Sequence, residues 1–192
     1  MDYLIERMRR AACAELVIVT RPEKHDVVEY ARRCDARVIF ARPRSVSESL
    51  LAGLGNLDDS DIVLFGFPDN IWEPEDGFVK LVEALDERCR VALGLFRSET
   101  PNRCDVVSVS PRGTITGVYV KSDEPPSDLI WGCGVAYAGA LRGLGDYDEP
   151  GHYFDHLAQH EDVRGVWLSE TCIDIGTRET LSELLGRETQ EG

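Results

Sequence analysis

The chain has 192 residues and a formal net charge of −14, from 35 acidic and 21 basic side chains, so its surface is predominantly acidic. This charge disfavours sequence-independent binding to nucleic acid or to anionic membranes, and no apolar run approaches the length of a transmembrane helix. A hydrophobic fraction of 43% over this length supports one well-buried core, and we expect a single domain over residues 1–192.

Helix and strand patterns alternate through the first half of the chain. Short runs rich in β-branched residues predict strands, and longer runs with apolar residues three or four apart predict helices. Pro22 is placed where a helix tolerates proline, in its first turn. The predicted order is helix 3–13, strand 15–20, helix 22–33, strand 37–41, helix 45–56, strand 61–66, helix 77–85 and strand 89–96.

The second half has a mixed character. A turn at Pro111-Arg112-Gly113 joins two strand-like runs, which predicts a β-hairpin. The predicted order is hairpin 106–109 and 114–120, strand 129–138, helices near Ala140 and over 150–160, strand 163–168 and a closing helix from about Thr177. Alternation followed by a hairpin indicates an α/β fold with a mixed sheet.

Two aspartates follow strand-like runs. Asp69 comes after the apolar run Ile62–Gly66, and Asp174 lies in the run Cys172-Ile173-Asp174-Ile175-Gly176. Ligands of open α/β sheets bind just beyond the carboxyl ends of strands, and Mg²⁺ is commonly held by one or two carboxylates together with substrate phosphates. The pair therefore predicts a divalent-metal site. The alternative is a structural role for each residue, with Asp69 in a turn and Asp174 as a helix cap. Both are routine positions for aspartate.

Basic residues also follow several predicted strands. Lys121 ends a strand before a Pro-rich loop, a suitable place for a phosphate-binding ammonium, although most such lysines are solvated charges. The arginines at strand ends could supply the local positive field that an anionic substrate requires in so acidic a protein. They are Arg21, Arg42, Arg44 and Arg97.

Histidines and cysteines offer weaker metal-binding patterns. His152, His156 and His160 recur every four residues and share a helix face, which indicates either a transition-metal site or simply an exposed face. The six cysteines form no C-x-x-C pair, so they are typical of reduced, mostly buried residues of a cytoplasmic protein rather than of a zinc site.

Several motifs, in order along the chain, resemble those of the sugar-phosphate nucleotidylyltransferases. Pro68-Asp69-Asn70 resembles the G-D-N strand end of that family, and Cys172–Thr177 resembles its W-x-D-x-G-T motif. Val120-Lys121-Ser122 resembles its E-K-P motif, Pro126–Leu129 the P-S-D/N-L stretch, and Trp131–Tyr137 the glycine-bearing strand that follows. The resemblance covers nearly the whole chain.

The resemblance implies a Rossmann-like, three-layer α/β/α fold and transfer of a nucleoside monophosphate from a nucleoside triphosphate to a sugar 1-phosphate, with release of pyrophosphate. Positioning and charge neutralisation carry most of the rate of such a reaction. The implied roles are Mg²⁺ coordination by Asp69 and Asp174, a grip on the sugar phosphate by Lys121, and substrate contacts by Asn70, Trp131, Gly134, Arg42 and Ser45.

The chain also departs from the family pattern. Met1–Glu6 resembles the helix that follows the family's Gly-rich triphosphate-binding loop, so the first βα unit has no counterpart. Three further positions differ from the family pattern: its glutamate before the lysine is Val120 here, and two of its glycines are Ser45 and Asp105. A noncatalytic module that binds a sugar phosphate or nucleotide sugar, or regulates a complete enzyme, is therefore the main alternative. A glycosyltransferase fits less well because no D-x-D follows Asp69.

The missing unit has a consequence for assembly. In the family it supplies a strand between those at 15–20 and 61–66, so two apolar strand edges are expected to lack a neighbour here. Unpaired edges tend to associate. We therefore expect either direct pairing of these two strands or an edge-mediated homodimer.

Overall fold

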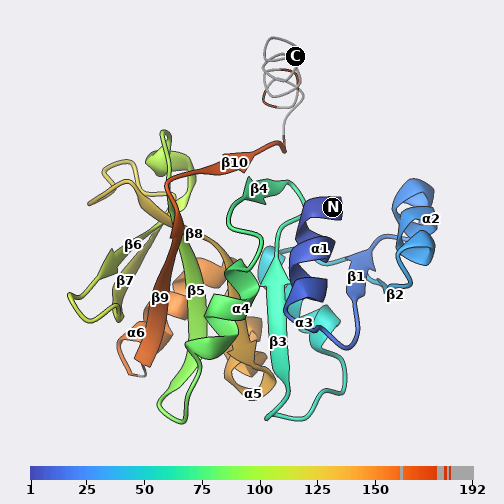
Figure 1. The fold of residues 1–192 in the computed structure, drawn as a ribbon, viewed down its shortest axis with the longest axis horizontal. Helices are drawn as coiled ribbons and strands as arrows, with labels where there is room; N and C mark the ends of the chain where they lie inside the picture. The colour runs from blue at the N-terminus through green and yellow to red at the C-terminus, as the bar shows by residue number, and fades with distance from the viewer. Residues whose placement is uncertain (161, 177–179, 181, 183–192) are drawn as a thin grey trace.

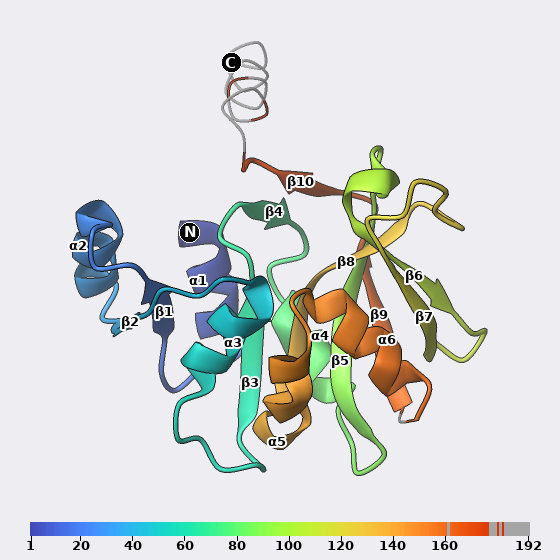
Figure 2. The same ribbon diagram turned by 180° about the vertical axis from the view of Figure 1, so that it is seen from behind.

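The structure is a computed structural model that describes residues 1–160, 162–176, 180 and 182. Its main body has three layers, with a sheet between two sets of helices (Figures 1 and 2). Helices α1 (Asp2–Arg10) and α4 (Gly77–Glu83) cover one face. Helices α3 (Val46–Leu54), α5 (Ala138–Leu141) and α6 (Pro150–Ala158) cover the other. The predicted α/β/α layering is confirmed.

The central sheet is mixed, as predicted. Its strands are β3 (Ile62–Gly66), β5 (Cys89–Arg97), β6 (Asp105–Val109), β7 (Ile115–Val120), β8 (Leu129–Tyr137) and β9 (Asp162–Ser169). One edge of β8 pairs along β5, and its other edge pairs first with β6 at Ile130 and then with β3, all antiparallel. β5 and β9 are parallel.

Strand β8 is apolar over its whole length because both of its faces are covered. Its side chains enter two separate cores, and the face changes between Trp131 and Cys133, where the pairing with β5 shifts register. Trp131 packs with Phe65 and Phe154 on the α6 side, whereas Cys133 and Val135 pack on the α1 and α4 side. The register also places Trp131 just past Gly66, the last residue of β3, because Gly66 is paired with Cys133.

Strands β1 (Val17–Thr20) and β2 (Arg37–Phe40) form a separate two-stranded parallel sheet, connected by α2 (His25–Arg33). Among the described residues, β1 pairs only with β2, and β3 pairs only with β8. Direct pairing of strands 15–20 and 61–66 is therefore wrong, because each strand keeps one edge without a strand neighbour. The homodimer remains a prediction.

Two short strands were not predicted. β4 (Asn70–Trp72) and β10 (Cys172–Asp174) pair antiparallel beyond the carboxyl end of β3 (Figure 1). Three residues are too few to show a period-two pattern.

Smaller differences concern the helices. The helix predicted from Pro22 begins at His25, after a turn, and two short 3₁₀ helices occupy Pro101–Arg103 and Arg142–Asp146. The closing helix predicted from Thr177 lies outside the described residues. Within the described part of the chain, no helix has the length and apolarity needed to cross a membrane.

Candidate functional site

The pairing of β4 with β10 brings the two predicted metal ligands together. Asp174 lies opposite Asn70, and the backbone N–H of Ile175 donates to the carbonyl oxygen of Asp69 at 2.8 Å. A Cβ atom built on Gly176 would lie 2.9 Å from Asp174 Oδ1 and 3.0 Å from Asp69 Oδ2. Two carboxylate oxygens from distant parts of the chain therefore face one point that carries no side chain.

This carboxylate pair, Asp69 and Asp174, fits a hard divalent cation. Neither side chain forms an ion pair with another described residue. The described residues hold no group of three or more His, Cys, Asp or Glu side chains arranged for a metal, so Mg²⁺ would complete its shell with water and substrate oxygens. Burial, and then Cys104 and the two aspartates, raise the pKa of Cys172 to about 12, so this nearby thiol stays protonated.

Lys121 is held in place by Glu149, an acidic residue outside the carboxylate pair. It follows β7 with a φ of 44°, a left-handed conformation that costs a non-glycine residue about 1–2 kcal/mol. Its Nζ lies 2.7 Å from Glu149 Oε1, and this hydrogen bond is the main reason that the pKa of Lys121 is raised. A phosphate that binds Lys121 would therefore compete with Glu149.

Asp105 lies beside the same ammonium. Its carboxylate fills the space over Gly151 in the first turn of α6, where a Cβ atom would lie 2.4 Å from Asp105 Oδ2. Burial is the largest effect on its pKa, which is raised; the negative charge of Glu149 adds to this, whereas Lys121, the Trp131 indole N–H and His152 oppose it. In the sequence, Asp105 was noted only because it stands where the family pattern has a glycine.

Glu149 was missed in the sequence, although its position directly before Pro150 places it at the start of a helix. Asp105, Lys121 and Glu149 together form a charged cluster with one more acid than base.

Two predicted substrate-binding residues lie in the core. Trp131 is only 6% exposed, and its ring centroid lies 5.3 Å from that of Phe154 and 5.7 Å from that of Phe67. A Cβ atom on Gly134 would lie 2.3 Å from Phe65 Cζ, so the ring of Phe65 fills the space that a side chain would need. The absence of a side chain at Gly134 thus serves packing between β3 and β8.

The remaining predicted substrate-binding residues, Arg42 and Ser45, lie at the ends of a strand and a helix. Arg42 forms an ion pair with Glu23. Ser45 caps α3, because its Oγ accepts the backbone N–H of Glu48 at 3.1 Å. The backbone N–H of Ser47 lies 3.4 Å from the carbonyl oxygen of Asp148, which brings the start of α3 close to the loop that carries Glu149.

The cap gives a prediction of its own. We expect Ser45→Ala to lower the free energy of unfolding by about 1 kcal/mol, the usual cost of losing an N-cap hydrogen bond. Chemical denaturation would measure it, and Ser45→Asp, which keeps an acceptor, should be close to wild type. If both variants matched wild type, the cap would contribute nothing to stability.

The cavity nearest to the charged cluster runs along α6. It has a volume of about 830 Å³ and is lined by acidic, histidine, tyrosine and glutamine side chains, including Tyr147, Glu149 and His152. The centroids of the His156 and His160 rings lie 4.7 Å apart with the ring planes tilted by 35°, and a ring nitrogen of His160 hydrogen-bonds the His156 carbonyl oxygen. The described residues give no three-histidine metal site.

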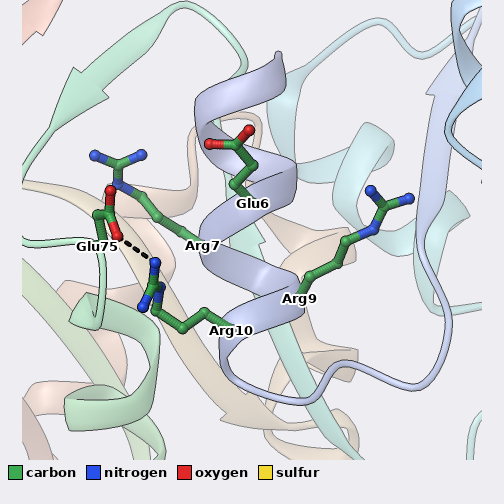
Figure 3. Close-up of a pocket in the computed structure, with 5 residues that line it drawn as sticks. All are labelled: Glu6, Arg7, Arg9, Arg10 and Glu75. Atoms are coloured by element: carbon green, nitrogen blue, oxygen red, sulfur yellow. Dashed lines mark hydrogen bonds and ion pairs between the residues drawn. The ribbon is translucent and has the colours of Figure 1, made fainter.

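A second cavity of about 380 Å³ lies against α1 (Figure 3). Its basic side chains are already engaged: Arg10 pairs with Glu75, and Arg7 pairs with Glu73 at 3.0 Å. The guanidinium of Arg7 also lies over the Trp72 ring, 5.1 Å from its centroid. These contacts attach α1 to β4, and thereby support the strand that follows Asp69.

Comparison with known proteins shows the fold. No protein-family model and no curated protein matches the chain. A Bacillus anthracis protein assigned as a glucose-1-phosphate thymidylyltransferase, solved with sucrose, aligns with a TM-score of 0.77, 15% identity, and coverage of 93% of this chain and 78% of that one. A UDP-glucose pyrophosphorylase solved with UDP-glucose aligns at 0.74, with 12% identity and coverage of 99% and 86%. A UDP-glucose pyrophosphorylase from Acinetobacter baumannii aligns at 0.76, with 14% identity and coverage of 95% and 79%.

Proposed function

We propose that this chain, which has the fold of the sugar-phosphate nucleotidylyltransferases, binds a Mg²⁺-nucleotide and a sugar 1-phosphate for nucleotidyl transfer. Asp69 and Asp174 would hold the metal, and Lys121 would contact the sugar phosphate. Bound Mg²⁺ would neutralise phosphate charge during displacement of pyrophosphate.

The convergence of Asp69 and Asp174 on Gly176 supports this proposal most directly. The two carboxylates approach one point from different strands, and Asp174 Oδ1 is oriented by the backbone N–H of Gly176, which donates to it at 2.7 Å. Such a pair offers oxygen ligands to a hard cation. The pairing of the neighbouring Asn70 with Asp174, and the contact of the partly buried Phe67 with Trp131, fix the loop that carries Asp69.

Metal removal tests the proposal. We expect UTP or dTTP to bind in the presence of Mg²⁺ and to bind at least about tenfold more weakly after EDTA treatment, a change of about 1.4 kcal/mol. Titration calorimetry would measure both affinities, and added Mg²⁺ should restore binding. Nucleotide affinity that does not change on metal removal would contradict the proposal.

A noncatalytic module for a sugar phosphate or nucleotide sugar is the second candidate. It is favoured by ion pairs that already engage two of the predicted phosphate-binding cations, since Lys121 pairs with Glu149 and Arg42 pairs with Glu23. Arg97 is likewise engaged by Asp128 and Glu170. Sugar-phosphate binding without pyrophosphate release in the presence of Mg²⁺ and nucleotide would support this candidate over the enzyme.

A further inference from the structure

The segment that carries Asp69 is not part of the main sheet. It runs from the end of β3 to the start of α4, and its strand β4 pairs only with β10 within the described part of the chain. The register places Asn70 opposite Asp174 and Trp72 opposite Cys172. Both carboxylates are thus attached to β4, Asp69 directly before it and Asp174 through the strand pairing. The geometry of the carboxylate pair therefore depends on what holds β4 in place.

Helix α1 contacts this segment at both of its ends. Leu4 lies over Gly66, where a Cβ atom would be 2.9 Å from Leu4 Cδ1, and Arg10 pairs with Glu75. Figure 3 shows Arg7 and Arg10 projecting to the Glu75 side of the helix. Residues three apart share a helix face, so Arg7 lies between the two end contacts and faces the middle of the segment.

Arg7 acts on the end of β4 as a buried cation. It is only 3% exposed, and its guanidinium lies over the rings of Tyr3 and Trp72, 5.4 and 5.1 Å from their centroids. Its Nη1 donates to the carbonyl oxygen of Tyr3 at 3.0 Å, and its Nη2 lies 3.0 Å from Glu73 Oε1. Trp72 is the last residue of β4 and Glu73 is the next residue, so one charge contacts both.

This burial is unfavourable for stability. Nε and Nη2 of Arg7 have no partner with hydrogen-bond geometry among the described residues, although Nη2 is within ion-pair distance of Glu73. A buried charge that is only partly paired is costly, and an apolar side chain of similar volume is often neutral or stabilising in its place. Stability alone therefore does not account for a guanidinium at this position.

We infer that Arg7 is a positioning residue for the carboxylate pair. Its charge holds Trp72 and Glu73 and thereby fixes β4. The fixed strand keeps Asp69 and, through the strand pairing, Asp174 in the geometry that a divalent cation needs. This inference rests on the proposed function and adds to it a residue that sets the Mg²⁺ affinity of the site.

Arg7→Met separates positioning from stability. We expect the Mg²⁺ midpoint, the concentration that gives half-maximal binding of UTP or dTTP, to rise about tenfold, the lower end of the range for residues that orient metal ligands. The lower end applies because Trp72 also contacts Phe78 and Phe96 in the core. The Tm should equal or exceed that of wild type, since methionine removes the partly paired charge. Mg²⁺ titration at fixed nucleotide and thermal unfolding measure the two effects.

Hydrogen exchange gives a readout that needs no ligand. In Arg7→Met the backbone amides of β4 and β10, and that of Ile175, which donates to Asp69, should exchange about tenfold faster than in wild type. The amides of β5 and β8 in the main sheet should keep their protection. A purely structural Arg7 would instead lower the Tm and the protection of the whole sheet.

Two further variants serve as controls. Arg10→Met makes the same substitution on the same helix and removes an exposed ion pair with Glu75, so its Mg²⁺ midpoint and the exchange of β10 should stay near wild type. Arg7→Lys keeps a positive charge but not the planar guanidinium. Its Mg²⁺ midpoint should lie between those of wild type and Arg7→Met.

The outcomes distinguish this inference from the function on which it rests. If wild type needs Mg²⁺ but the Arg7→Met midpoint matches wild type, the inference is overturned and the proposed function stands. A lower Tm with loss of protection throughout the sheet also overturns it, as does an Arg7→Lys midpoint equal to that of Arg7→Met. If nucleotide binding by wild type does not depend on Mg²⁺, the proposed function fails, and the exchange of β4 and β10 alone decides whether Arg7 holds β4.

Discussion

Replacing Asp69 by asparagine is expected to abolish the Mg²⁺ dependence of nucleotide binding and to lower nucleotidyl transfer by on the order of 10²–10³-fold. Asparagine keeps the size of the side chain but removes half of the charge that the carboxylate pair offers to the metal. Calorimetric titration with and without Mg²⁺ measures the first effect, and pyrophosphate release measures the second.

Asp76→Asn is the matched control for Asp69→Asn. Asp76 follows β4, whereas Asp69 precedes it; Asp76 pairs with Lys80 at 3.1 Å on the surface and is about half exposed. An exposed pair of this kind contributes about 0.3–0.5 kcal/mol, so stability and Mg²⁺ dependence should both stay near wild type. If Asp69→Asn also kept its full Mg²⁺ dependence, Asp69 would not be a metal ligand.

The long apolar runs account for what the sequence predicted well. Strands β5 and β8 are covered on both faces, so their composition alone identified them, and the order of motifs along the chain led to the fold. The same reasoning placed Asp69 correctly at the end of β3. It could not show that Asp174 lies beside it, because that depends on the pairing of two three-residue strands.

Other parts of the site depend on contacts between distant residues. Glu149 and Lys121 are 28 residues apart and meet only because α6 packs against β7. For Gly134 the sequence predicted a functional role that the structure does not favour. Its place in a family-like motif suggested substrate contact, but it lies opposite Phe65 in the sheet register, which gives it a packing role. A family-like motif does not by itself show whether a residue packs against a neighbouring strand or contacts a substrate in the folded sheet.

Gly134→Ala is expected to lower the free energy of unfolding by about 1–3 kcal/mol, because a methyl group must displace the ring of Phe65 in a filled core. For a chain of this size each kcal/mol corresponds to about 2–4 °C in Tm, which calorimetry resolves readily. Gly145→Ala is the matched control, since its Cβ atom would lie at an ordinary 3.4 Å from Leu51.

A second substitution shows whether packing or substrate contact explains the effect. Phe65→Leu removes the ring atoms closest to the new methyl group, so Gly134→Ala should cost less in that background, although Phe65→Leu itself destabilises the aromatic cluster. If Gly134→Ala instead kept its Tm and weakened sugar binding, the packing role would be wrong and the substrate contact implied by the family resemblance would apply.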